Sequence, residues 1–448
     1  MKKYFYIISF IIIALTAYYL INKQKKVAIP GLLERTGTTA AGTEWLNTKE
    51  AIQGYLKILR SDPKNIKTKL ALAQAYLQEA RVTANYAYYM PAAAILMDDV
   101  LKAEPENYEA LCVKAAIELN QHHFSEGKNT ALKAQKVNPS GAFVYGLLCD
   151  AYVELGNYDS AVVMADKMVS IRPDLKSYSR VSYLREIFGD YPGAIDAMNL
   201  AVKAGYPGLE QTCWAINQLG LLYEHTGDLA KAEYQYKTAI NQRADYAYSV
   251  AGLGRIEAAK KNYPKAIKYL ESAAEFIPEY SFRDELTDIY ILNNEKDKAK
   301  TNATAVVAML QNTSDEIPKE GETGHGHFAD RELAYAYLKT GQIDKAVFHA
   351  KVEYERRPNN IDVNETMAWV LYKQNKYSEA LPFIEKALKT SSKNPVLNCR
   401  AGLIFAKVGQ KQKAQQFIKN GMNTNPFLPA LLMAEVKGVV NTNGYAQK

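Results

Sequence analysis

The chain has 448 residues and a net charge of +7, with Lys interleaved with Glu along most of its length. No basic run occurs beyond the flank of the N-terminal apolar segment, so a nucleic-acid partner is disfavoured. This length ordinarily suggests two or three globular domains, unless the chain is built from internal repeats.

Residues 1–26 differ in composition from the rest. Lys2 and Lys3 precede an apolar run over residues 4–21 that only Ser9 and Thr16 interrupt. A run of this length is close to the lower limit for crossing a bilayer and long for the core of a signal peptide. We predict a membrane anchor that contacts the lipid bilayer through residues 4–21. The alternative is a signal sequence whose cleavage would leave an exported soluble protein.

The orientation of this segment is nearly balanced, because positive charges flank it on both sides. Its short Met-Lys-Lys start resembles bacterial export signals. The expectation is therefore a single-pass protein of a bacterial inner membrane, with the remainder of the chain in the periplasm after a linker over residues 27–43.

A spacing of 34 residues runs through the rest of the sequence. Pro105, Pro139, Pro173 and Pro207 lie 34 residues apart, and alanines keep the same interval further along the chain. A period of this length indicates stacked two-helix units, each of which packs on its neighbours.

The unit that begins at Ala142 shows how each repeat is built. Its two apolar stripes have helical spacing, with Tyr145, Leu148, Cys149 and Tyr152 on the first helix and Tyr158, Ala161, Ala165 and Met168 on the second. Gly156 ends the first helix, where a left-handed backbone is favoured. Three prolines, Pro91, Pro192 and Pro264, share one position in their units, which predicts the first turn of the second helix.

These features resemble the tetratricopeptide repeat (TPR) family, most closely in Leu371-Tyr372-Lys373-Gln374-Asn375-Lys376-Tyr377-Ser378-Glu379-Ala380. The resemblance implies an all-α, right-handed superhelical solenoid of about ten helix-turn-helix repeats. We expect a first array over 44–310, an inserted flexible loop over 311–326, a second array over 327–426, and a capping helix and tail over 427–448. Residues 44–63 read as a lone second helix, with Ala51 and Ile58 on its packed face.

The resemblance also implies a concave groove lined by first helices, in which a protein or peptide partner binds. The residues expected to line this groove are aromatic or polar: Trp214, Asn217, Tyr248, Arg255, Arg331, Tyr335, Glu365, Trp369 and Tyr372. The alternative for Trp214 and Trp369 is that they fill the core between repeats. The paired Lys and Asn of the carboxylate-clamp subfamily do not occur at the matching positions.

Catalysis is not expected, because no nucleophile-elbow, phosphate-loop, dinucleotide-binding or HExxH motif occurs. The sequence therefore predicts a non-catalytic scaffold without a cofactor, which would help to assemble or organise a bacterial envelope complex. The alternative is a metal-handling accessory protein, because His325 and His327 follow several carboxylates. The four cysteines show no CxxC spacing and are expected to be small buried thiols, although a bond between Cys112 and Cys149 stays open.

Overall fold

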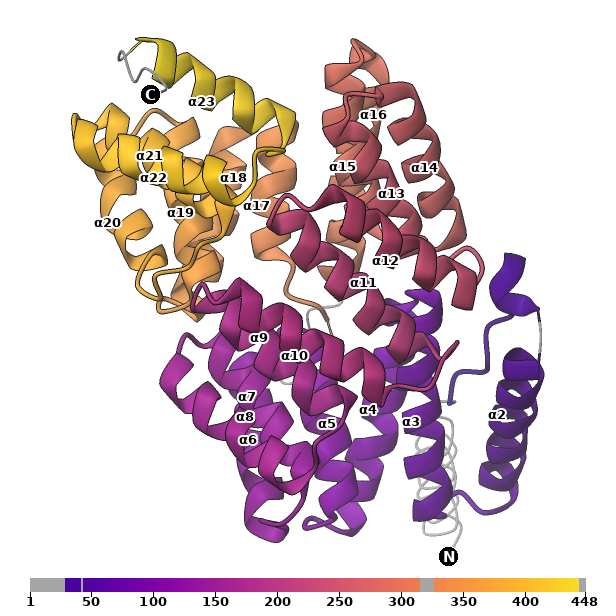
Figure 1. Cartoon of the computed structure of the whole chain (residues 1–448). Helices are drawn as coiled ribbons and strands as arrows, with labels where there is room; N and C mark the ends of the chain where they lie inside the picture. The colour runs from indigo at the N-terminus through magenta and orange to yellow at the C-terminus, as the bar shows by residue number, and fades with distance from the viewer. Residues whose placement is uncertain (1–28, 42, 315–325, 443–448) are drawn as a thin grey trace, which may run out of the picture.

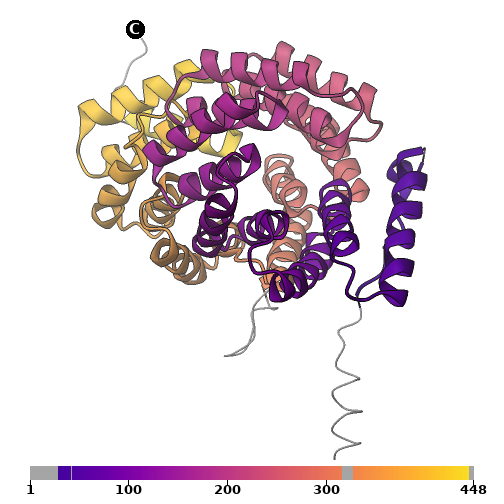
Figure 2. The ribbon, with the colours of Figure 1, turned by 90° about the horizontal axis from the view of Figure 1, so that it is seen from below.

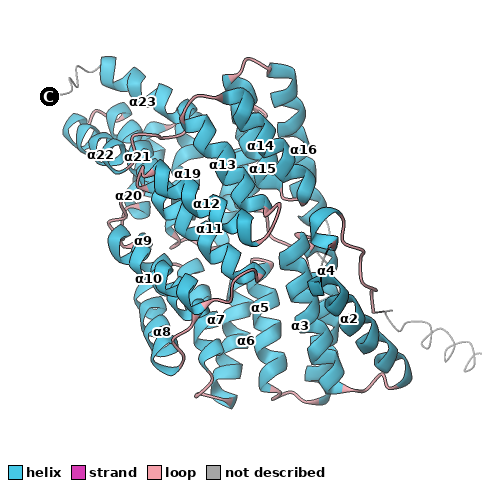
Figure 3. Ribbon diagram, turned by 45° about the vertical axis from the view of Figure 1, so that its right-hand side comes forward, coloured by secondary structure: helices cyan, strands magenta, loops and turns pink. Residues whose placement is uncertain are grey.

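The computed structural model describes residues 29–41, 43–314 and 326–442 of the chain. In these ranges all regular secondary structure is helical (Figure 3). The first helices of ten successive hairpins are α3(Ile66–Thr83), α5(Tyr108–Asn120), α7(Ala142–Glu154), α9(Leu175–Ile187), α11(Glu210–His225), α13(Ala247–Ala259), α15(Tyr280–Leu292), α17(Asp330–Lys339), α19(Ile361–Lys373) and α21(Pro395–Lys407). The second helices are α4(Tyr86–Ala103), α6(Phe124–Val137), α8(Tyr158–Ile171), α10(Tyr191–Ala204), α12(Leu229–Gln242), α14(Tyr263–Phe276), α16(Lys296–Ser314), α18(Ile343–Arg356), α20(Tyr377–Ala387) and α22(Lys411–Thr424).

We number these hairpins as repeats 1 to 10, from α3–α4 to α21–α22. A short helix η1(Gly37–Ala40) and α2(Thr43–Ser61) precede them, and α23(Ala430–Thr442) follows. The helices pack as consecutive pairs, as the 34-residue period predicts. Small residues let the two helices of a pair approach closely: Ala161, Ala232 and Ala380 are all completely buried.

Every repeat bends between its two helices at one residue with positive φ. Glycine favours this left-handed conformation because it has no Cβ, and asparagine tolerates it better than most residues. The ten residues at this bend, in chain order, are Ala84, His122, Gly156, Gly189, Gly227, Lys261, Asn294, Gly341, Asn375 and Gly409. Repeat 7, in which Asn294 stands where several other repeats have glycine, thus keeps the same turn.

Repeat 1 differs from the expectation for its proline. Pro192 and Pro264 lie in the first turn of their helices, as predicted, but Pro91 lies inside α4. Both helices of this repeat are 18 residues long, against 13 and 14 in repeat 2, so α4 begins before the proline.

The N-terminal end of the array is closed by an extended segment and one helix. Residues 29–41 lie where a first helix would pair with α2, and Arg35 is buried there against Glu79 and Glu44. The buried stripe of α2 is Trp45, Ile52 and Leu59. The predicted packed face was therefore wrong by one residue, since Ala51 and Ile58 are exposed.

The array curls round a central axis and then stacks on itself (Figures 1 and 2). The chain rises as it curls: repeats 1–6 make the first superhelical turn, which we call the lower coil, and repeats 7–10 with α23 continue into a second turn, the upper coil. The interhelical turns of repeats 2 to 5 contact the inter-repeat loops that lead into α17, α19, α21 and α23. Each contact joins elements six repeats apart, so one superhelical turn takes six repeats.

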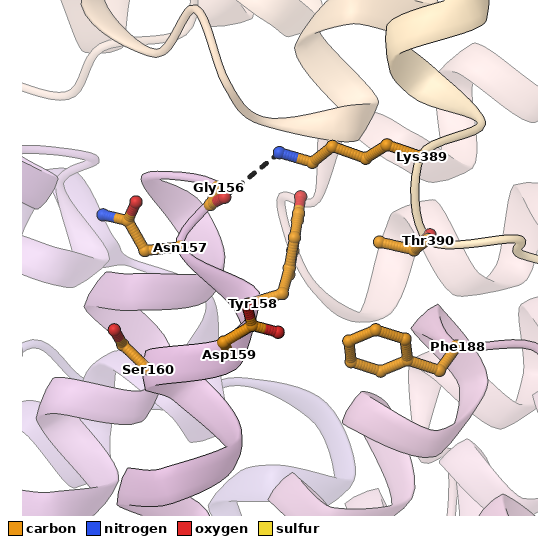
Figure 4. A pocket seen from close by; sticks show the side chains of 8 residues that line it. All are labelled: Gly156, Asn157, Tyr158, Asp159, Ser160, Phe188, Lys389 and Thr390. Carbon is orange, nitrogen blue, oxygen red and sulfur yellow. Dashed lines mark hydrogen bonds between the residues drawn. The ribbon is translucent and has the colours of Figure 1, made fainter.

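We call this contact between the two coils the seam. Asn360 donates from its side-chain amide to the carbonyl oxygen of Glu154 at 3.0 Å, and Asn425 does the same to Glu224 at 3.0 Å. Lys389 Nζ donates to the carbonyl oxygens of Gly156 at 3.1 Å and Asn359 at 2.6 Å. Figure 4 shows Lys389 reaching across to Gly156 above a hollow of about 370 Å³.

Glycine is required where the two coils approach most closely. A Cβ on Gly156 would lie 2.2 Å from the carbonyl oxygen of Asn359, and one on Gly227 would lie 2.8 Å from Pro426. These glycines therefore serve the interhelical turn and the seam together.

Three expectations from the sequence fall partly or wholly outside the described residues. The first is the bilayer segment over residues 4–21, because residues 1–28 are not described. Within the ranges that are described, no helix combines the length and apolar character needed to cross a bilayer. Of the expected loop over 311–326, residues 311–314 continue α16 and residues 315–325 are not described. Of the expected cap, α23 covers residues 430–442.

The close approach within each hairpin gives a first prediction. We expect Ala161→Leu to destabilise the chain by about 1–3 kcal/mol, because the position is completely buried and the added volume overpacks the hairpin. Val163→Leu on the same helix is the matched control, since Val163 is 59% exposed. Urea unfolding followed by circular dichroism measures both, and equal losses would mean that the assigned packing of α8 is wrong.

Candidate interaction surface on the first helices

The first helices form the inner wall of the coils. Successive first helices contact one another, as α5 with α7, α11 with α13 and α17 with α19 do. The second helices lie outside them (Figure 2). The inner wall is therefore the surface on which side chains from many repeats meet.

A charged network joins repeats 5, 6 and 7 on this wall. Arg255 Nε donates to both carboxylate oxygens of Glu224, at 3.0 and 3.1 Å, and its Nη1 donates to Glu285 at 3.1 Å. Burial alone would lower the pKa of Arg255, but Glu224 and Glu285 raise it well above its ordinary value. Burial raises the pKa of Glu285, against the opposite effect of Arg255. The guanidinium is thus fixed between two neighbouring repeats.

Trp214, Asn217 and Tyr248, the other groove residues predicted in repeats 5 and 6, differ in how exposed they are. Asn217 is only 3% exposed and accepts a hydrogen bond from Ser249 Oγ at 3.0 Å, so it belongs to the packing between repeats. Trp214 and Tyr248 are half-buried, and the Tyr248 ring lies 5.5 Å from that of Phe282. The structure therefore leaves the edges of Trp214 and Tyr248, but not Asn217, on the surface.

A second network joins repeats 8, 9 and 10. Arg400 Nη1 donates to the hydroxyl of Tyr335 at 2.9 Å and to Glu365 at 3.0 Å. Arg331 lies beside this pair, with its guanidinium 5.9 Å from the Tyr335 ring. The predicted residues Arg331, Tyr335 and Glu365 are thus brought together. Arg400 was not predicted, because it stands one position after the groove position of its repeat.

Trp369 and Tyr372 correct the expectation of exposed groove aromatics. They are 6% and 8% exposed and stack on each other with ring centres 5.0 Å apart. Arg400 and Lys373 cover the Trp369 ring, each at 4.6 Å, and Glu435 of α23 pairs with Lys373. The alternative weighed for Trp369, a place in the core between repeats, is the one that the structure shows.

The histidines near the inserted segment lie at the seam. The rings of His122 and His327 are 4.2 Å apart, and His122 Nδ1 lies 2.9 Å from the carbonyl oxygen of Phe328. Among the described residues, no group of three His, Cys, Asp or Glu side chains is arranged to hold a metal ion. His325 lies outside those residues, so the metal-handling alternative gains no support here. The four cysteines are buried and free, as expected for small core thiols.

This histidine pair predicts acid sensitivity. Burial, followed by the charge of Arg357, lowers the pKa of His122 to about 4, and burial followed by His122 lowers that of His327 to about 4. A depressed histidine pKa contributes stability that is present above pH 6.5, the ordinary value, and is lost as the pH falls towards 4. Burial raises the pKa of Glu154 to about 7, despite Arg357, and this acts in the opposite direction.

The histidine contribution is isolated by comparing the parent chain with His122→Asn/His327→Gln. Asparagine tolerates the φ of +63° at residue 122, so the turn is kept. Between pH 7 and pH 4.5 we expect the parent to lose about 1–3 kcal/mol more of its unfolding free energy than the variant, after allowing for partial exposure. Parallel pH profiles in urea unfolding would contradict this assignment.

Comparison with known proteins agrees with the repeat geometry. Residues 217–281, which include Glu224 and Arg255, match the tetratricopeptide repeat family model.

Residues 217–281 are therefore identified as tetratricopeptide repeat sequence. No curated protein matches this chain. Among solved structures, TTC0263, a thermophilic TPR protein of Thermus thermophilus, is 21% identical with a TM-score of 0.37, over 42% of this chain and 97% of that one.

Two further solved structures are also similar to parts of this chain. YrrB, described as a TPR protein with an unusual peptide-binding site, is 19% identical with a TM-score of 0.29, over 42% of this chain and 94% of that one. MamA is 21% identical with a TM-score of 0.29, over 36% of this chain and 93% of that one.

Proposed function

We propose that this TPR protein is a non-catalytic scaffold that holds a segment of a partner protein against the inner wall of its coils. The observation that carries the proposal is the linked set of side chains from repeats 8, 9 and 10, where Arg331, Tyr335, Glu365 and Arg400 meet. Interface hot spots are enriched in Tyr and Arg, and paired charges at the rim select among partners.

The inner wall suits recognition because its side chains are held before any partner arrives. The Tyr335 hydroxyl accepts hydrogen bonds from Arg400 and from Thr366, so its ring has one orientation. Ordering a side chain in advance lowers the entropy lost on binding. The half-buried rings of Trp214 and Tyr248 offer further apolar contact on repeats 5 and 6.

A photo-crosslinking amino acid placed in the full chain tests this proposal. Position 335 on the inner wall is compared with position 348 on α18, where Phe348 is 60% exposed. We expect irradiation of cells to link position 335, but not 348, to one recurring protein. Tyr335→Ala should weaken retention of that protein at least tenfold at a temperature where the variant is still folded, since the ring also packs on the core and its hydroxyl accepts from Arg400. Equal crosslinking from both positions would refute a role for the inner wall.

We further propose that the scaffold works at a bacterial envelope, anchored by residues 4–21 with its repeats in the periplasm. The apolar run and the Met-Lys-Lys start support this placement. N-terminal sequencing of the membrane-bound chain should begin at residue 1 or 2, and protease added to spheroplasts should digest the repeats. A start between residues 17 and 30 would indicate signal cleavage instead, and protection of the repeats would reverse the orientation.

A further inference from the structure

The two kinds of surface that contact each other at the seam also occur at the two ends of the superhelix. Interhelical turns lie at one end and inter-repeat loops lie at the other. At the seam, an interhelical turn of the lower coil receives an inter-repeat loop of the upper coil. The interhelical turns of the upper coil face outward instead. Among the described residues, nothing lies within 4 Å of the Cβ positions of Gly341 and Gly409, whereas the equivalent position of Gly156 is 2.2 Å from the Asn359 oxygen.

The inter-repeat loops at the opposite end have the same sequence pattern as a loop that contacts an interhelical turn at the seam. The docked loop into α19 contains Pro358-Asn359-Asn360, and Asn360 caps the following helix while its amide donates across the seam. Pro63-Lys64-Asn65 and Pro105-Glu106-Asn107 repeat this Pro-x-Asn pattern, and both asparagines cap their helices in the same way. The amides of Asn65 and Asn107 donate instead to the local carboxylates of Asp62 and Glu104.

The charges of the two ends are complementary. The outward interhelical turns of repeats 8 to 10, over 339–342, 373–376 and 407–411, contain five lysines and no acidic residue. Lys339 and Lys373 pair with carboxylates of the same chain, which leaves three lysines for another copy. Lys376, Lys407 and Lys411 are exposed. The loops at the other end, over 62–65, 104–107, 138–141 and 172–174, contain four acidic and two basic residues. An open hollow of about 530 Å³ lies among Glu104, Pro105, Glu106 and Asn107.

We propose that copies of this chain associate end to end, with the inter-repeat loops of one lower coil seated on the interhelical turns of another copy's upper coil. The contact continues the interface that each chain already makes with itself at the seam. The two surfaces are different, so the association is heterologous and open, and it can add further copies instead of closing as a symmetric dimer. Opposite charges at the two ends set the polarity of the stack.

The test uses the full chain in detergent, with mass followed by sedimentation velocity over a concentration series. We expect the average mass of the parent to rise with concentration, and to rise less at high salt because the charges are screened. Lys376→Glu/Lys411→Glu blocks the upper end and Glu104→Lys/Glu106→Lys blocks the lower end. Each variant should self-associate at least tenfold more weakly. Lys133→Glu/Lys167→Glu, on the exposed outer faces of α6 and α8, makes the same change in charge as the first variant and should behave as the parent.

Mixing the two end-blocked variants gives the decisive result. Each retains the end that the other lacks, and the two altered ends are again opposite in charge, so mixing the variants should restore the association that neither shows alone. A parent that stays monomeric, a control that weakens association equally, or a mixture that associates no better than either variant alone would each overturn the proposal. Association through residues 4–21 alone would leave all variants unchanged and would overturn it as well.

Discussion

Replacing Gly156 with alanine should destabilise the chain by about 2–5 kcal/mol. A residue with a Cβ at φ +78° loses about 1–2 kcal/mol through backbone strain. The same Cβ would also lie 2.2 Å from the carbonyl oxygen and 2.3 Å from the carbonyl carbon of Asn359, so the two coils would have to move apart.

Gly341→Ala separates these two costs. Gly341 has nearly the same φ, +74°, and no described atom lies within 4 Å of its Cβ position. It should lose only the strain, about 1–2 kcal/mol. Urea unfolding gives the stability of both variants, and hydrogen exchange of the amides around residues 153–158 reports the seam. Equal losses in the two variants would show that the close approach at Gly156 does not stabilise the fold.

Tyr236→Ala should cost about 3–5 kcal/mol, because it empties the centre of repeats 5 and 6. The Tyr236 ring is completely buried, and Cβ atoms on Gly220 and Gly252 would lie within 2.5 and 2.6 Å of it. Its hydroxyl donates to Glu224 at 2.6 Å and accepts from Arg255 at 3.2 Å.

Tyr236→Phe is the matched variant for this position. It keeps the ring and removes the hydroxyl, so it should lose about 1–2 kcal/mol. Thermal unfolding of both variants measures the difference. If phenylalanine costs as much as alanine, the hydrogen bonds to the Arg255 network matter more than the packing of the ring, and our account of this core is wrong.

The repeat period predicted the hairpins because local packing repeats in sequence. Ala161, Ala232 and Ala380 mark the close approach of two helices, and each is completely buried. The seam could not be predicted in this way. Its contacts join residues about 200 positions apart, such as Asn425 and Glu224, and depend on how many repeats complete one superhelical turn. That number follows from small packing angles, which no single residue encodes.

The sequence predicted which residues lie on the inner wall, but not which of them are exposed there. Arg331, Tyr335 and Glu365 converge because equivalent positions of stacked first helices share one wall. Trp369 and Tyr372 occupy the same kind of position, yet they are buried. Arg400 and the terminal helix cover them, and both come from later in the chain. Residue spacing within one repeat therefore could not distinguish a groove aromatic from a core aromatic.

The six-repeat spacing of the seam also limits how this chain can change in length. In an open array, losing one repeat shortens the molecule and leaves the other contacts intact. Here the same deletion between repeats 3 and 9 would bring Glu154 opposite the wrong loop, and every later seam contact would be displaced by one sixth of a turn. Viable length variants within this stretch should therefore differ by whole superhelical turns, while repeats added after α22 would be tolerated one at a time.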